Sequence, residues 1–154
     1  MAKKLLIAED NKFTATQYKK FLESKGYDVT VFYNGAHCIE KFKNELRYKR
    51  IILHDSSPPF DYVLLDHDMP KMNGSDASKI IHNLCPKQKI IFLSAYGQNI
   101  LNSHDDSKEG FLQIMQKPFS LNFLLKKIET KSFSSIKRSN DHIITTASSP
   151  ETIR

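Results

Sequence analysis

The sequence predicts an α/β fold in which five parallel strands form a doubly wound sheet with helices on both faces. Three observations support this prediction. Short apolar runs of strand length alternate with longer segments of helical period. Glycine, proline and asparagine residues separate many of these segments. Regular alternation of strands and helices is typical of βαβ units, which build parallel sheets. The predicted strands cover about residues 5–8, 29–32, 62–65, 90–93 and a weaker run at 112–115.

Four segments between and after these strands have helical periodicity. The first ends before Gly26, a suitable residue for the position after a helix, and Asn11 is a suitable N-cap. The second starts at Asn34-Gly35 and places Ile39, Phe42 and Leu46 on one face. The four helices are expected over about residues 12–25, from 35 onward, 76–84 and 120–130.

The chain is expected to hold one domain, over residues 1–130, and a tail over 131–154. The tail is rich in Ser and Thr and poor in apolar residues, so we expect it to be mostly disordered. Residues 47–60 are predicted to be a loop insertion, in which 51–53 could extend the preceding helix or form a short extra element. Residues 98–110 are polar and weakly periodic, so a helix there is expected to be short or shifted.

Composition excludes several classes of function. The net charge of +6 comes from scattered Lys and Arg residues without a long basic block, so no nucleic-acid partner is predicted. No apolar run approaches the roughly 20 residues of a membrane span, and the N-terminal apolar stretch is too short for a signal peptide. Two cysteines without metal-ligand spacing indicate no disulfide framework. A soluble, cytoplasmic protein without a membrane partner is expected.

Reactive side chains follow four of the predicted strands, at the point where each strand ends. Glu9 and Asp10 end the first strand, Asp66 the third, Ser94 the fourth and Lys117 the fifth. Each motif alone is weak, because such residues commonly cap helices or form turns. Sites in open α/β sheets form at the carboxyl ends of the strands, so we expect these residues to meet at one edge.

This set of residues suits phosphoryl transfer. Carboxylates that converge repel each other, and a divalent cation relieves the repulsion. Glu9, Asp10 and Asp66, with the backbone carbonyl of Asp68, suit Mg²⁺, or Mn²⁺ in its place. Asp66 could itself attack phosphorus and form an aspartyl phosphate. Lys117 and the Ser94 hydroxyl would then stabilise the phosphoryl oxygens.

The chain resembles the receiver domain of two-component response regulators over about residues 3–130. The most specific segment is 61–74, with the letters DYVLLDHDMPKMNG, where Asp66 matches the phosphoacceptor. Ser94-Ala95 matches a hydroxyl residue followed by a small one. Lys117-Pro118 matches the family's lysine and proline. The resemblance implies a flavodoxin-like sheet in the order 2-1-3-4-5 and a cis peptide before Pro118.

The resemblance also implies a partner and a switch. The phosphoryl group would come from a histidine kinase or a phosphotransfer protein, and the signal would pass to an unidentified downstream protein. Phosphorylation would draw the Ser94 hydroxyl inward, and an aromatic residue on the fifth strand normally follows it. That position is Ile114 here, so the usual coupling is in doubt. Asp68 and Tyr96 hold positions expected to tune the lifetime of the phosphoryl group.

Three functions remain open. The first is a stand-alone phospho-switch, monomeric or weakly dimeric, that signals by protein–protein contact. The second is a degenerate receiver that serves as a constitutive docking module, which Ile114 favours and the complete acidic set disfavours. The third is a metal-dependent phosphatase with Asp66 as nucleophile. Haloacid-dehalogenase-like enzymes usually carry their nucleophile after the first strand, which disfavours this last reading.

Overall fold

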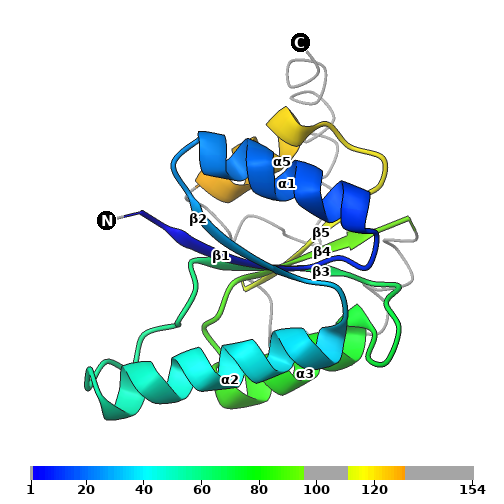
Figure 1. The fold of residues 1–154 in the computed structure, drawn as a ribbon. Helices are drawn as coiled ribbons and strands as arrows, with labels where there is room; N and C mark the ends of the chain where they lie inside the picture. The colour runs from blue at the N-terminus through cyan, green and yellow to red at the C-terminus, as the bar shows by residue number, and fades with distance from the viewer. Residues whose placement is uncertain (1, 96–110, 131–154) are drawn as a thin grey trace, which may run out of the picture.

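The structure is a computed structural model that describes residues 2–95 and 111–130. Over these residues, parallel strands alternate with helices as the sequence predicts (Figure 1). The strands are β1 (Lys4–Ala8), β2 (Asp28–Phe32), β3 (Tyr62–Asp66), β4 (Ile90–Ser94) and β5 (Leu112–Gln116). The helices are α1 (Lys12–Ser24), α2 (Gly35–Ile51), α3 (Gly74–Leu84) and α5 (Leu121–Glu129).

The five strands form one parallel sheet in the order β2-β1-β3-β4-β5, which confirms the predicted order. In register, Leu6 of β1 lies between Thr30 of β2 and Val63 of β3. All residues of β3 and β4 are buried. Burial on both faces explains why these strands are continuous apolar runs and not alternating ones.

Helices cover both faces of the sheet, with α1 and α5 on one side and α2 and α3 on the other (Figure 1). Successive side chains of a strand point to opposite faces, so each strand contributes to two cores. Leu5 and Ile7 of β1 pack in the core that contains Leu22 of α1 and Leu124 of α5. Leu6 of β1 packs in the other core, with Phe42 of α2.

The helix ends follow the predicted signals. The Asn11 side chain accepts a hydrogen bond from the backbone N–H of Thr14 and caps α1, as expected. Gly26 adopts a φ of 94° just after α1, a conformation that favours glycine. Helix α3 begins at Gly74, two residues before the predicted start, because the Asn73 side chain caps it.

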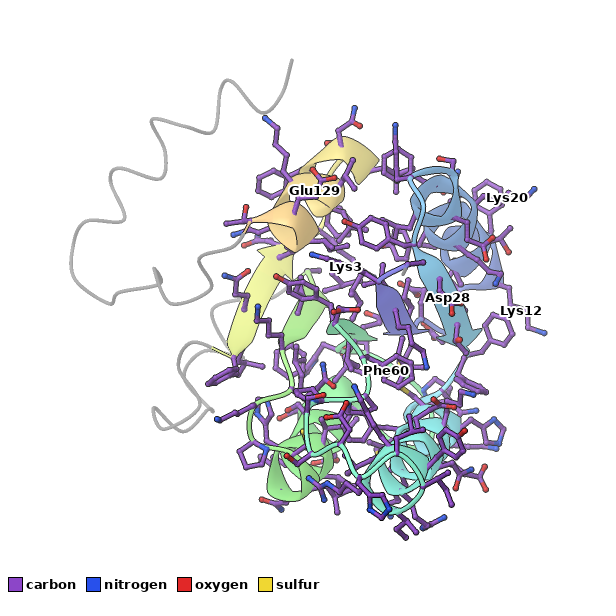
Figure 2. All side chains as sticks on the ribbon, turned by 90° about the vertical axis from the view of Figure 1, so that its left-hand side faces the viewer. Lys3, Lys12, Lys20, Asp28, Phe60 and Glu129 are labelled. Carbon is purple, nitrogen blue, oxygen red and sulfur yellow. The ribbon has the colours of Figure 1, made fainter. Side chains whose placement is uncertain are left out.

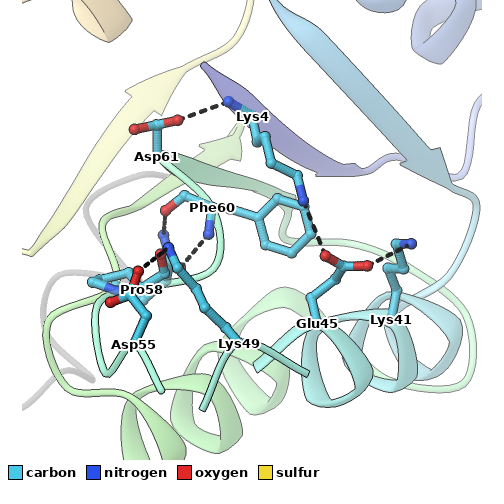
Figure 3. Close-up of polar contacts among 9 residues, drawn as sticks. Lys4, Lys41, Glu45, Lys49, Asp55, Pro58, Phe60 and Asp61 are labelled. Carbon is cyan, nitrogen blue, oxygen red and sulfur yellow. Dashed lines mark hydrogen bonds and ion pairs between the residues drawn. The ribbon is translucent and has the colours of Figure 1, made fainter. Parts of the chain in front are cut away.

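The segment 47–60 is only partly the loop that the sequence predicts. Helix α2 continues to Ile51, and the non-helical connection to β3 begins at Ile52. The connection is tied to its surroundings (Figure 3). The Lys49 Nζ donates to the Pro58 carbonyl at 3.0 Å, and the Gln88 amide donates to the Phe60 carbonyl at 2.8 Å. Residues 47–51 therefore continue the backbone hydrogen bonds of α2, although their polar composition suits a loop.

Two predicted segments lie outside the described residues. These are the helix expected within 98–110 and the tail over 131–154. Among the helices that the structure does describe, none combines the length and the apolar content that crossing a bilayer requires.

Candidate functional site

The predicted site residues come together at the edge of the sheet where the parallel strands end. Glu9 follows β1, Asp66 is the last residue of β3 and Ser94 is the last residue of β4. Lys117 follows β5, and its N–H donates to the Ser94 carbonyl at 2.8 Å. The peptide between Lys117 and Pro118 is cis, as expected.

Three carboxylates form the centre of the site. Oxygen atoms of Glu9, Asp10 and Asp66 all lie within 4.8 Å of one another. Glu9 is 1% exposed and Asp66 is 5% exposed, whereas Asp10 is exposed to solvent. The Glu9 Oε2 accepts a hydrogen bond from the backbone N–H of Asn11 at 3.1 Å. Two buried acids and one exposed acid therefore form a pocket that opens to solvent through Asp10.

Lys117 is the cation of this pocket. Its Nζ lies 3.2 Å from the Glu9 Oε1 and 3.2 Å from the Asp66 Oδ1. The ammonium group therefore joins the two buried carboxylates, which would otherwise lack a nearby opposite charge among the described residues. Three carboxylates against one ammonium leave the pocket with an excess of negative charge when all are ionised.

Burial and the neighbouring charges both shift the pKa values of the site. Burial raises the pKa of Asp66 from 3.8 to about 7, the charge of Glu9 adds to the rise, and Lys117 opposes it. Burial acts to lower the pKa of Lys117, but the charges of Glu9 and Asp66 outweigh burial and raise it. Near neutral pH, Lys117 is therefore protonated, and the pKa of Asp66 lies close to the pH of the solution.

Gly74 explains the Met-x-Gly part of the recognised segment. A Cβ atom on Gly74 would lie 2.7 Å from the backbone oxygen of Asp66, closer than such contacts allow. The N–H of Gly74 also donates to the His67 carbonyl at 3.0 Å. Glycine therefore lets the start of α3 pack directly against the end of β3, which positions Asp66.

The remaining predicted residues have different surroundings. The Asp68 side chain is 71% exposed and lies 3.2 Å from the His67 Nδ1, and it is not part of the cluster that Glu9, Asp10 and Asp66 form. Ser94 is buried, and Ala95 is exposed beside it. Ile114 pairs with Phe92 in register and packs against the core beneath α2 and α3. Tyr96 lies outside the described residues.

Tyr18 is a neighbour of the site that the sequence analysis assigned only to a helix face. Burial raises the pKa of its phenol, and the charges of Glu9 and Asp66 raise it further. Its ring stacks on Phe119, with centroids 6.0 Å apart. Helical spacing correctly predicts that Tyr18 faces the core, but only the packing of α1 on the sheet brings it near the two acids.

Comparison with known proteins identifies the class. The sequence profile of the response regulator receiver domain matches residues 5–129, so the chain belongs to the response regulator receiver family. Members of this family are phosphoacceptor domains of two-component signalling and not catalytic enzymes. The phosphatase reading of Asp66 therefore has no support.

Individual relatives agree with this assignment. The response regulator receiver protein CpdR of Brucella abortus is 32% identical over 127 residues, which cover 82% of this chain and 94% of that protein. The chemotaxis protein CheY of Thermotoga maritima is 35% identical over 120 residues, covering 77% of this chain and 88% of CheY. Both relatives match nearly along their full length, so the similarity extends through the domain.

Solved structures show the same fold. A CheY-like receiver domain from Methanospirillum hungatei superposes with a TM-score of 0.65 at 26% identity, covering 83% of this chain and 91% of that one. The receiver domain of the sensor histidine kinase PA1611 from Pseudomonas aeruginosa has a TM-score of 0.64 at 21% identity, covering 83% and 95%. That second structure holds a magnesium ion in its active-site cleft.

Proposed function

We propose that this protein is a response regulator receiver that accepts a phosphoryl group on Asp66. The observation that carries the proposal is the ammonium group of Lys117 at 3.2 Å from both Glu9 and Asp66, inside a pocket of three carboxylates. The donor would be the phosphohistidine of a histidine kinase or a phosphotransfer protein. Family membership supports this class of donor.

The pocket fits a divalent cation. Mg²⁺ favours oxygen ligands and commonly uses one or two carboxylates together with phosphate oxygens. Glu9, Asp10 and Asp66 offer such oxygens within 4.8 Å of one another, and the Asp68 carbonyl is the predicted fourth contribution. When bound, Mg²⁺ or Mn²⁺ would neutralise charge on the transferring phosphoryl oxygens.

The chain's own residues would then carry the transfer. A carboxylate oxygen of Asp66 attacks phosphorus, a P–O bond forms and the P–N bond of the donor histidine breaks. Asp66 must be ionised for this step, and its raised pKa of about 7 makes the ionised form sensitive to a nearby cation. Lys117 would turn from Asp66 toward a phosphoryl oxygen, and the Ser94 hydroxyl would donate to another.

The signal would pass onward by protein–protein contact. Inward movement of Ser94 would alter the packing around β4 and β5, where Ile114 replaces the usual aromatic switch residue. Ile114 packs against the core. As an isoleucine, it has no ring that could move between an outer and an inner position. We therefore expect a smaller structural response than an aromatic switch would give. Asp68 and Tyr96 would set how long the phosphoryl group survives.

Direct phosphorylation tests the proposal. Incubation with Mg²⁺ and acetyl phosphate should give an acid-stable, base-labile adduct with the mass of one phosphoryl group. The Asp66→Asn variant should give none, and omission of Mg²⁺ should lower the yield at least ten-fold. An adduct that forms equally on Asp66→Asn would contradict the assignment of Asp66.

The same Ile114 favours a second candidate, a receiver that docks constitutively and does not switch. Amide exchange of β5 and α5 separates the two, measured with and without the phosphoryl group. A change confined to the pocket would support docking. A change that spreads through Ile114 to α5, and that Ile114→Ala suppresses, would support the switch.

A further inference from the structure

Four large apolar side chains are exposed at the end of α2. Tyr48, Ile51, Ile52 and Leu53 are 54%, 60%, 59% and 54% exposed. We refer to these four residues as the α2 tip. Figure 1 shows this end of α2 reaching beyond the start of the strands. All four are more than half exposed and lie within six residues of one another, and grouped exposed apolar residues can mark an interaction site.

The α2 tip is held out by the polar contacts around it. The N–H groups of Ile52 and Leu53 both donate to the Tyr48 carbonyl, at 2.8 and 3.3 Å. The Asp55 N–H donates to the Lys49 carbonyl at 3.0 Å, and the Lys49 Nζ lies 3.6 Å from the Asp55 carboxylate (Figure 3). These bonds hold the backbone of the turn in place, and the apolar side chains on it are exposed. A preorganised surface loses little entropy on binding.

The α2 tip is anchored to α3 as well. The Arg50 guanidinium donates to the Leu84 carbonyl, at the end of α3, at 2.9 Å. On the other side, Phe60 stacks on Phe42 of α2, and Lys4 lies over the Phe60 ring. The end of α2 that carries the tip is therefore held against α3 and Phe60.

This edge of the sheet, where the strands begin, is also basic. We call it the basic edge and define it as residues 2–4, 25–28, 49–61, 85–89 and 126–130. It holds nine Lys and Arg residues against four carboxylates, Asp28, Asp55, Asp61 and Glu129. Figure 2 views the protein from this side, with Lys3, Phe60 and Glu129 labelled. The nine are Lys3, Lys4, Lys25, Lys49, Arg50, Lys87, Lys89, Lys126 and Lys127.

We propose that the basic edge is a docking surface for an anionic lipid membrane, with the α2 tip inserted at the interface. Exposed aliphatic and aromatic side chains would enter the headgroup region, and the surrounding lysines would lie near anionic headgroups. The acidic pocket lies at the opposite edge of the sheet, so it would face away from the membrane and stay accessible to a protein partner.

The arrangement of charges favours a lipid surface over other occupants. The cations are spread across the ends of α1, α2 and α5 and the turn before β4, which matches an extended anionic plane. Cations near helix ends also complement the helix dipole, but the dipole gives no reason for four exposed apolar residues. Nucleic acid would match the charge and not the α2 tip. A second copy would bring two basic edges together.

Vesicle flotation tests the inference. Vesicles of equimolar phosphatidylglycerol and phosphatidylcholine should bind the protein, and vesicles of phosphatidylcholine alone should not. The double variant Ile51→Ser/Ile52→Ser should lower the partition constant at least ten-fold. Lys87→Gln and Lys126→Gln should each lower it about five-fold, in line with the contribution of one cation near an anionic surface. Raising the salt concentration should weaken binding further.

Matched variants at the opposite edge serve as controls. Phe13→Ser removes a side chain that is 72% exposed in the first turn of α1, and it should leave vesicle binding unchanged. Lys12→Gln should do the same. Equal binding by wild type and the Ile51→Ser/Ile52→Ser variant would overturn the inference, because it would indicate non-specific adhesion of a cationic protein. A concentration-dependent dimer that the same variant abolishes would also overturn it and assign the α2 tip to self-association.

The inference is independent of the phosphoacceptor proposal. Flotation uses the unphosphorylated full chain, and phosphorylation by acetyl phosphate uses no lipid. Failure of one experiment therefore leaves the other result intact.

Discussion

The two edges of the sheet carry charge in opposite ways. At the edge where the strands end, Glu9 and Asp66 are buried within contact of one lysine, and burial raises the pKa of Asp66 to about 7. At the edge where the strands begin, most of the cations are exposed or half-exposed. The same sheet thus holds a small, strongly coupled acidic pocket and a broad basic surface.

The contrast between the two edges shows where a single charge has a large effect. Charges in a buried pocket interact strongly because water screens them poorly. Exposed charges contribute little one by one, and their effect comes from their sum over a surface. Changes at the acidic edge should therefore alter stability and ion binding sharply, whereas changes at the basic edge should be small in the isolated protein.

The largest expected effect follows from backbone packing at the acidic edge. Gly74→Val should lower the free energy of unfolding by about 2–4 kcal/mol, because its Cβ would meet the Asp66 backbone oxygen at 2.7 Å. Urea denaturation measures the loss. Ser75→Val, one position along the same helix, is the control and should cost clearly less. Equal losses would mean that close approach to Asp66 is unimportant.

The next effect concerns the buried acid. Because the pKa of Asp66 is raised from 3.8 to about 7, the folded protein binds more protons than the unfolded chain between those values. Stability therefore falls as pH rises from about 4 to about 7. Asp66→Asn should raise the free energy of unfolding by about 1–3 kcal/mol at pH 8, with the gain lost near pH 4.

Thermal or urea unfolding across this pH range checks the sign. Asp28→Asn is the matched control, since Asp28 is exposed at the basic edge and should give nearly no pH-dependent difference. A gain for Asp66→Asn that stays constant from about pH 4 to pH 8 would contradict the electrostatic explanation.

Divalent metal should relieve the same repulsion. Mg²⁺ at ten times its dissociation constant should stabilise the protein by about 1.4 kcal/mol. The Asp10→Asn variant should show a smaller gain, because one of the three carboxylates loses its charge. Isothermal titration and the melting temperature measure the effect. Affinity should fall below about pH 7 as protons compete for Asp66. If the stabilisation by Mg²⁺ did not depend on pH, the ion would bind outside this pocket.

The smallest effect is expected at the basic edge. Lys4→Met removes the ion pair with Glu45 at 2.9 Å and the contact of the ammonium with the Phe60 ring (Figure 3). Both groups are partly exposed, so the loss should be at most about 1 kcal/mol. High salt should reduce the difference between the variant and the wild type. A loss as large as that of Gly74→Val would erase the contrast between the two edges.

Much of the fold follows from local sequence. The five apolar runs predict the strands because parallel strands buried on both faces need continuous apolar residues. Asn11 marks the start of α1 because its side chain accepts a backbone hydrogen bond, and Gly26 marks the end because a residue without a Cβ tolerates a positive φ. The end of α2 was less predictable. The letters of 51–53 suit an extension of the helix or a short extra element within the predicted loop, and the structure continues α2 to Ile51.

The site was predictable as a set of residues and not as a geometry. Glu9, Asp10, Asp66, Ser94 and Lys117 could be selected because each follows a predicted strand, and parallel strands end at one edge. The sequence could not reveal that Lys117 contacts both buried acids, or that Tyr18 lies near them. Those relations join residues up to 108 positions apart and depend on how the helices pack.

Local patterns of apolar, capping and reactive residues were enough to predict the class of fold, the acidic set and the family. Which charges are buried and coupled, and which apolar side chains remain exposed, became known from the packing in three dimensions. The burial of a side chain depends on neighbours from distant segments of the chain, which local sequence patterns do not reveal. Burial raises the pKa of Asp66, and the lack of covering neighbours leaves the α2 tip exposed.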